Sequence, residues 1–192
     1  MVTYKLRNYL TVSSATFIKG VIKVAEYGES IVKRFLDNKG LKVNKIEEGD
    51  EQTPDFEVFK DFQQILFCEE KTLEYDDFVG AKSDSTYNAI SRHMHKAVKQ
   101  FKSVNPNHEL PNVLAFVNLD TLKDMHDLFI TLTGYALLDN GSYMKIRRVG
   151  HRTIEDISHV DLILWFDKDQ FINYLWKDDI DNETRKYLEK LL

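Results

Sequence analysis

The 192-residue sequence contains one cysteine, three prolines and no apolar run close to the length of a membrane span. The lone Cys68 can form no internal disulfide, so we expect a reducing compartment. The first residues lack the apolar block of a signal peptide, and a membrane helix would need about 20 apolar residues. We therefore expect a cytoplasmic protein without a membrane segment.

Several motifs of cofactor and nucleophile chemistry are also missing. The sequence has no glycine-rich phosphate loop, and Gly28-Glu29-Ser30 lies inside a predicted helix instead of at a nucleophile elbow. The histidines form no ligand set, because His93 and His95 are two apart on a predicted helix and face different directions. His93 can still join phosphate contacts. No activated Ser, Cys or Tyr is evident, which argues against a covalent intermediate.

The charge of the chain is divided between segments. The net charge is −5, which does not favour a generic nucleic-acid binder. Residues 47–77 nevertheless hold twelve acids against two lysines, whereas residues 85–108 hold four cations and no acid. An acidic patch that binds metal beside a basic patch that binds phosphate would explain this division. Chance segregation of surface charge is the alternative.

Length and periodicity predict one mixed α/β (α+β) domain over residues 1–192, with a central sheet flanked by helices. An αβββαβ core is expected from a helix at 15–38, strands at 41–46, 55–60 and 64–73, a helix at 85–102 and a strand at 113–117. A short strand at 3–11 precedes this core. The extension, residues 119–192, is expected to contain a helix at 121–133, strands at 143–149 and 160–166, and helices at 168–177 and 182–192, with His151 and Arg152 in a loop.

Glu29 interrupts the buried face predicted for the first helix. Ala25, position 29, Val32 and Leu36 follow the spacing of a helix seam that faces the core. A carboxylate in such a seam is costly unless it is paired or bound to a metal. The alternative to a functional role is a salt bridge to a buried Lys or Arg, such as Lys71.

Three charged residues converge on the predicted hairpin at 55–73. Asp55 opens the first strand, and Glu69 and Lys71 share one face of the second strand, because side chains alternate. Glu70 points to the opposite face. Both faces of the second strand are apolar at its start, so these charges are expected to leave the interior at the edge of a cleft. A solvated hairpin face is the alternative.

These residues suit metal-dependent phosphodiester chemistry. Mg²⁺ prefers oxygen ligands and keeps several waters, so the carboxylates of Asp55 and Glu69 and the backbone carbonyl of Glu70 would suffice. Lys71 would hold the attacking water and offset the negative charge of the transition state. Mn²⁺ suits the same ligands.

The order of these residues resembles the PD-(D/E)xK nuclease superfamily, which has the restriction-endonuclease-like fold. Pro54-Asp55 matches the PD pair, Glu69-Glu70-Lys71 matches the (D/E)xK triplet, and GESIVKRFLDNKG is similar to the first-helix pattern that carries Glu29. The resemblance covers about residues 15–118. It implies metal-dependent cleavage of nucleic acid, with Asp55 and Glu69 as ligands, Lys71 at the water and Glu29 as an auxiliary acid.

The predicted second helix would supply contacts to phosphate. Lys96 and Gln100 lie one turn apart beside its apolar face, and Arg92 and Lys99 extend its basic surface, although a solvated helix face is the alternative. The sequence thus predicts a Mg²⁺-dependent endonuclease acting on DNA, with RNA a weaker option. A catalytically silent nucleic-acid-binding or assembly subunit is the alternative. A homodimer or partner contact is expected through residues 119–192.

Overall fold

The structure is a computed structural model that describes residues 24–47, 49, 52–75 and 84–192. The strand expected at 3–11 and residues 15–23 of the first expected helix lie outside these residues. The helices are α1 (Val24–Asn38), α2 (Ser85–Val104), α3 (Met125–Thr133), α4 (His151–Ile157) and α5 (Asn182–Leu191). The strands are β1 (Lys42–Lys45), β2 (Phe56–Lys60), β3 (Gln63–Leu73), β4 (Asn112–Asn118), β5 (Tyr135–Leu137), β6 (Tyr143–Lys145), β7 (Leu162–Asp167) and β8 (Gln170–Trp176).

The described part of the chain forms a mixed six-stranded sheet in the order β1-β2-β3-β4-β7-β8. Strands β1, β2 and β3 form an antiparallel meander, and β4 and β7 then run parallel to β3. Strand β8 returns antiparallel to β7, while β5 and β6 form a separate two-stranded hairpin. The mixed α/β class is confirmed, and the elements from α1 to β4 follow the expected order.

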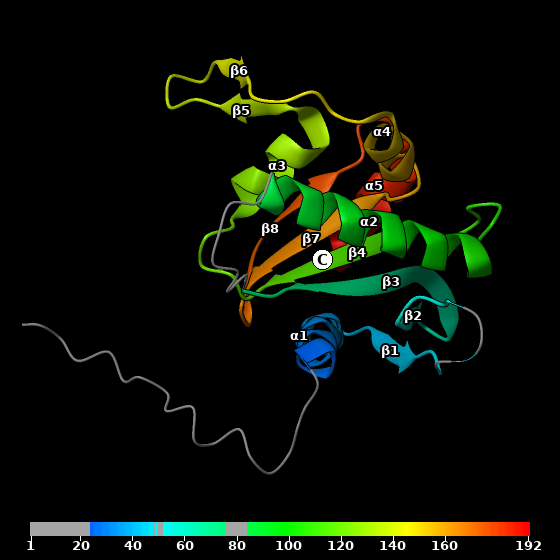
Figure 1. The fold of residues 1–192 in the computed structure, drawn as a ribbon. Helices are drawn as coiled ribbons and strands as arrows, with labels where there is room; N and C mark the ends of the chain where they lie inside the picture. Colours follow the sequence, from blue (N-terminus) through cyan, green and yellow to red (C-terminus); the bar gives the residue numbers. More distant parts are fainter. Residues whose placement is uncertain (1–23, 48, 50–51, 76–83) are drawn as a thin grey trace, which may run out of the picture.

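Helices cover both faces of the sheet, as Figure 1 shows for α1 and α2. Side chains of α1 and α5 share one core with the β3 residues Leu66 and Cys68. Side chains of α2, α3 and α4 form a second core with Phe67 and Leu73 of the same strand. Strand β4 is buried along its whole length, as expected for its continuous apolar run. The parallel strands therefore lie between two helical layers.

Residues 168–177 were expected as a helix, and this prediction is wrong. They contain β8, which pairs with the buried strand β7. This pairing satisfies the backbone amides and carbonyls along the edge of β7. Lys168 adopts a left-handed conformation with φ of 55° in the tight turn between the two strands. The β-prone residues Phe171, Ile172, Tyr174 and Trp176 were the signal for a strand.

Two further local predictions are wrong. His151 and Arg152 begin helix α4 instead of lying in a loop, since Gly150 provides the extended backbone at its N-cap. Ala25 is exposed, because the buried face of α1 runs through Gly28, Ile31, Val32 and Leu36, of which only Val32 and Leu36 belong to the predicted seam. Among the described residues, no helix has the length and apolar character needed to cross a membrane.

Candidate functional site

Asp55 lies at the point where β2 begins, directly against β3. One of its carboxylate oxygens, Oδ2, accepts a hydrogen bond of 2.7 Å from the Glu70 amide. The Asp55 amide in turn donates to Glu69 Oε2 at 2.9 Å. The antiparallel pairing of β2 and β3 reaches Phe56 and Cys68, so Asp55 continues the ladder with side-chain bonds in place of backbone bonds. These contacts bring the predicted PD and (D/E)xK segments together.

Alternation along β3 separates its two adjacent glutamates. Glu69 is fully buried and forms an ion pair with Lys71, two residues along the strand. Glu70 points to the opposite face, where its carboxyl accepts a hydrogen bond of 2.7 Å from the Thr72 hydroxyl and lies against Gly28 of α1. The side chain of Glu70 therefore lies opposite Glu69, as the sequence predicted, and the structure shows that this face is the one α1 covers.

The backbone of Glu70 still faces the site. Its amide donates to Asp55, beyond the last backbone pair of β2 and β3. In a strand the amide and carbonyl of one residue point to the same edge. The Glu70 carbonyl therefore points to the edge where Asp55 lies, which is the orientation that the predicted carbonyl ligand requires.

Burial sets the ionisation of the carboxyl groups. It raises the pKa of Glu69 to about 8, although the Lys71 ammonium acts in the opposite direction. Burial also raises the pKa of Asp55, against its hydrogen bond from the Glu70 amide and the charge of Lys71. A bound cation would supply the positive charge that favours the ionised form of both groups.

A cleft of about 390 Å³ opens beside Asp55 and Lys71. Its lining residues come from three segments and are Gly49, Gln52, Thr53, Asp55, Lys71, Lys96 and Gln100. Gln100 donates from Nε2 to the Thr53 carbonyl at 2.9 Å, which ties α2 to the segment before β2. Lys96 and Gln100 thus line the same cleft as Asp55 and Lys71, two of the predicted catalytic residues.

The other predicted phosphate contacts lie elsewhere on α2. Arg92 and Lys99 are exposed and do not belong to the residues that line the cleft. Lys99 acts electrostatically on Asp156 of α4, together with Arg152 and Lys102. The basic surface of α2 therefore continues away from the cleft toward α4.

Glu29 forms an ion pair with Lys45 of β1, with its side chain 13% exposed. The salt bridge that the sequence left open therefore exists, with Lys45 as the partner in place of Lys71. The Lys45 charge also lowers the pKa of Asp55, opposing the effect of burial. Glu29 is thus linked to Asp55 through a lysine and does not line the cleft.

Sequence reasoning missed Lys45 and undervalued His93. Lys45 follows the buried Val43 by two residues on β1, so both side chains lie on the same face of the sheet, the face that α1 covers. His93 precedes Gln100 by two helical turns, on the side of α2 that faces the cleft. Burial and the charges of Lys71, Arg92 and Lys96 lower its pKa to about 4. Its Nδ1 atom is buried and has no hydrogen-bond partner within the described parts of the chain.

The donors at the site are hard oxygen atoms. Two carboxylates, from Asp55 and Glu69, meet at the edge to which the Glu70 carbonyl points. Where the chain is described, no group of three or more His, Cys, Asp and Glu side chains could hold a metal ion. Mg²⁺ and Mn²⁺ need fewer protein side chains than three. Mg²⁺ keeps several waters and takes one or two carboxylates plus oxygens of the substrate. The donor set therefore fits such an ion.

Comparison of the chain with protein-family models, with curated proteins and with solved structures finds no match. The chemistry of the site is therefore inferred from its own residues. Two desolvated carboxylates, a lysine ion-paired to one of them, and a second lysine and an amide across a cleft form a set suited to handling a phosphate ester.

Proposed function

We propose that the chain hydrolyses phosphodiester bonds of DNA with the help of a divalent metal ion, as an endonuclease. The observation that carries this proposal is the meeting of Asp55, Glu69 and Lys71 where β2 begins. Lys96 and Gln100 line the same cleft and supply donors for a phosphate. A purely structural hairpin has no need of such a set, because desolvated carboxylates destabilise a fold.

We also propose that the sheet has the restriction-endonuclease-like fold. The supporting observation is the order α1, β1, β2, β3, α2 and β4, with the meander antiparallel and β4 parallel to β3. The Pro54-Asp55 pair and the Glu69-Glu70-Lys71 triplet occupy neighbouring strands of this meander. Their positions in the sheet agree with the resemblance found in the sequence.

The chain's own residues divide the work of the reaction. Asp55, Glu69 and the Glu70 carbonyl would hold Mg²⁺ or Mn²⁺, which lowers the pKa of bound water and polarises the phosphoryl group. Lys71 donates a hydrogen bond to the attacking water and offsets the charge that builds on the phosphate. Lys96 and Gln100 position the phosphate from the opposite side of the cleft. Glu29 is the auxiliary acid. It forms the ion pair with Lys45, whose charge lowers the pKa of Asp55.

One observation favours a second function, a nucleic-acid-binding subunit without catalysis. Both carboxylate oxygens of Glu69 already have partners, since Oε1 contacts Lys71 and Oε2 accepts from the Asp55 amide. A metal bound to Glu69 would compete with the Lys71 and Asp55 contacts for the same two oxygens. A cleavage assay distinguishes the two functions, because a silent subunit binds DNA and never cleaves it.

Cleavage of supercoiled plasmid in the presence of Mg²⁺ or Mn²⁺ tests the proposal. Wild type is expected to nick and linearise the plasmid. Asp55→Asn and Lys71→Ala are each expected to slow cleavage by about 100-fold or more, the usual effect of removing one group that stabilises the transition state. DNA binding should persist in Lys71→Ala, because Lys96 and the basic surface of α2 remain.

Two surface variants serve as matched controls. Asp61→Asn changes an exposed acid whose backbone has φ of 50°, a conformation that Asn tolerates. Lys42→Ala changes an exposed lysine on β1. Wild type that cleaves neither DNA nor RNA with either metal contradicts the enzyme proposal. Cleavage of RNA alone would replace DNA as the substrate.

A further inference from the structure

A strongly basic segment lies far along the chain from the candidate cleft. Residues 140–154 contain four cations and no acid, in a chain whose net charge is −5. Arg147 is already engaged, since it forms an ion pair of 2.9 Å with Asp84 and its guanidinium lies 5.2 Å from the Tyr87 ring centroid. Lys145, Arg148 and Arg152 are exposed, and Arg152 forms a long ion pair of 4.0 Å with Asp156. This segment therefore presents positive charge to a partner.

The same segment carries exposed apolar side chains on the β5–β6 hairpin. All three residues of β6 are exposed, and Tyr143 and Met144 are 63% and 49% exposed. Leu137 and Tyr135, their neighbours on β5, are exposed as well. Apolar surface of this kind marks an interaction site in most proteins, because water covers it at a cost in free energy.

The hairpin is held firmly at its base. The Gly134 carbonyl accepts hydrogen bonds from the amides of Ile146 and Arg147, at 2.9 and 3.2 Å. Gly134 has φ of 80°, and a Cβ at this position would strike the Arg147 carbonyl. An isolated two-stranded hairpin is marginally stable in water, so these contacts and the Arg147 ion pair fix its position. The exposed surface is thus preorganised for binding.

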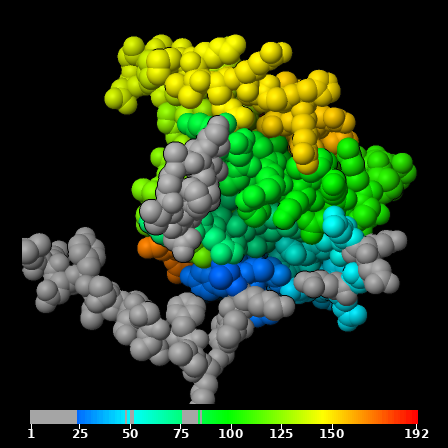
Figure 2. Space-filling view, in the orientation of Figure 1, coloured from blue at the N-terminus to red at the C-terminus, as the bar shows by residue number. Residues whose placement is uncertain are grey.

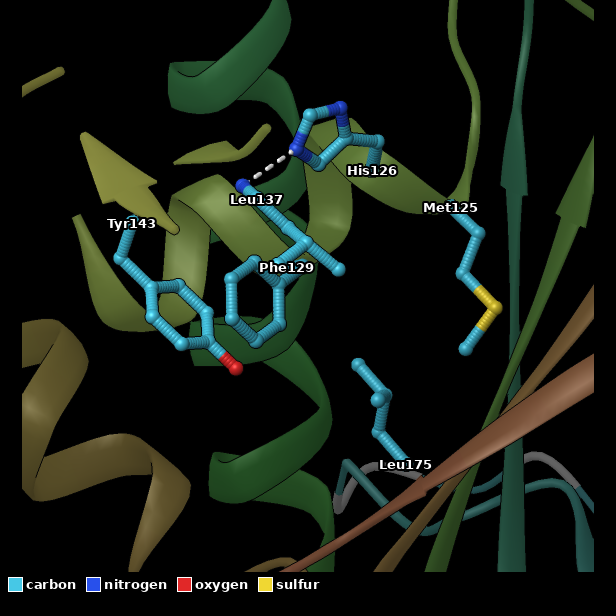
Figure 3. Close-up of a pocket in the computed structure, with 6 residues that line it drawn as sticks. All are labelled: Met125, His126, Phe129, Leu137, Tyr143 and Leu175. Atoms are coloured by element: carbon cyan, nitrogen blue, oxygen red, sulfur yellow. Dashed lines mark hydrogen bonds between the residues drawn. The ribbon is translucent and has the colours of Figure 1, made fainter. Parts of the chain in front are cut away.

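An aromatic slot adjoins the basic segment. The Tyr143 ring stacks on Phe129 of α3, with centroids 6.1 Å apart, and Figure 3 shows both rings beside an open space. The space is a pocket of about 350 Å³ whose other lining residues are Met125, His126, Leu137 and Leu175. Aromatic rings beside cations form the usual platform for unpaired bases, whose faces stack while their phosphates meet Lys and Arg.

The charge distribution decides between the candidate occupants. A two-fold dimer through this patch would bring the Lys145 and Arg148 charges of both copies into one contact, where like charges repel. Duplex DNA offers phosphates but hides the faces of its bases, so it would leave the apolar surface of the hairpin without a partner. Single-stranded DNA satisfies both the cations and the exposed rings.

We propose that the β5–β6 hairpin, with Lys145, Arg148 and Arg152, binds single-stranded DNA through phosphate contacts and through base stacking on Tyr143. In Figure 2 the hairpin (yellow) and α4 (yellow to orange) lie on the face that α2 (green) also forms. A strand held there lies on the same side of the molecule as the basic surface of α2. The proposal rests on the proposed function, because it specifies the form of the DNA.

Fluorescence anisotropy with labelled oligothymidylate of about 16 nucleotides, the upper end of known site sizes, measures this binding. The titrations contain EDTA, so they do not depend on cleavage. Wild type is expected to bind the single strand more tightly than a duplex of equal length. Tyr143→Ala should weaken binding about tenfold through the loss of one stacked base. Lys145→Gln and Arg148→Gln should each reduce the salt slope by about 0.7.

Two controls lie on α5, on the other face of the sheet. Tyr187→Ala and Lys186→Gln change an exposed tyrosine and an exposed lysine there and should leave binding unchanged. Thermal melting by circular dichroism establishes that each variant is folded. The inference is overturned by a preference for duplex, by unchanged binding in folded Tyr143→Ala, or by a dimer that Tyr143→Ala dissociates. If wild type binds the single strand but cleaves no nucleic acid with either metal, only the proposed function is overturned.

Discussion

Glu69 and Glu70 are neighbours in the chain, but their carboxyl groups lie on opposite faces of β3. Glu69 contacts Lys71 and Asp55, whereas Glu70 contacts Thr72 and Gly28. Burial raises the pKa of Glu70 to about 8, as it does that of Glu69, against the hydrogen bond from Thr72. Because side chains alternate along a strand, the sequence predicted that Glu69 and Glu70 point to opposite faces of the sheet. Their burial was not predictable, because it depends on helices distant in the sequence.

The raised pKa of Glu70 predicts that stability falls as pH rises. Unfolding lowers this pKa from about 8 to its ordinary 4.5, so the folded state holds an extra proton between these values. Raising pH within that window destabilises the fold by up to about 1.4 kcal/mol per pH unit for one such group. Glu70→Gln stays neutral and should show a shallower loss.

Urea unfolding of wild type and Glu70→Gln at several pH values between about 5 and 9 measures this difference. Some slope should remain in the variant, because Glu69 is unchanged. Glu26→Gln, at an exposed position of α1, should behave as wild type. Identical slopes for wild type and Glu70→Gln would refute the assignment of a protonated Glu70.

At the scale of elements, helix α1 packs tightly against β3 at Gly28. A Cβ at this position would overlap the Glu70 carboxyl and the Thr72 hydroxyl, both of which lie against the helix. Gly28→Ala should therefore lower the free energy of unfolding by about 1–2 kcal/mol. Overpacking costs about 1–3 kcal/mol and outweighs the gain of about 1 kcal/mol in helix propensity.

Chemical denaturation checks this prediction, with Gly49→Ala as the matched control, since a Cβ there meets no atom within 4 Å. Adding Glu70→Ala to Gly28→Ala removes the carboxyl that obstructs the new methyl group. The double variant should therefore lose less than the two single changes combined. Simple additivity of the two changes would contradict the proposed contact.

Periodicity predicted most elements of the described sheet and missed those set by tertiary pairing. Strands β1 to β4 and helix α2 occur close to their expected ranges, because α2 has a helical apolar period and β3 and β4 contain continuous apolar runs. Residues 168–177 were expected as a helix, and the exposure of side chains along β8 indeed shows no clean alternation. This segment becomes a strand because β7 offers an unpaired edge, which local sequence does not reveal. Short β5 was missed for the same reason.

At the scale of the whole molecule, segregated charge corresponds to separate surfaces. The acidic segment supplies Asp55 and Glu69, and the basic segment supplies Lys96 on the opposite wall of the cleft. The sequence predicted these residues as one site, because their order matched a known motif. The sequence offered a salt bridge for Glu29 but did not identify Lys45 as the partner, because that pair depends on how α1 sits on the sheet. Partner or homodimer contacts through residues 119–192 stay predictions.

In the proposed site, Asp55, Glu69 and the Glu70 carbonyl hold a divalent ion. A crystal of the protein soaked in Mn²⁺ tests it, because the anomalous signal identifies the metal directly. We predict a peak between the Asp55 and Glu69 carboxylates, at about 2.0–2.6 Å from their oxygens, with Lys71 displaced from Glu69 Oε1. A Mn²⁺ peak elsewhere, with the Glu69 contacts to Lys71 and Asp55 intact, would contradict the account.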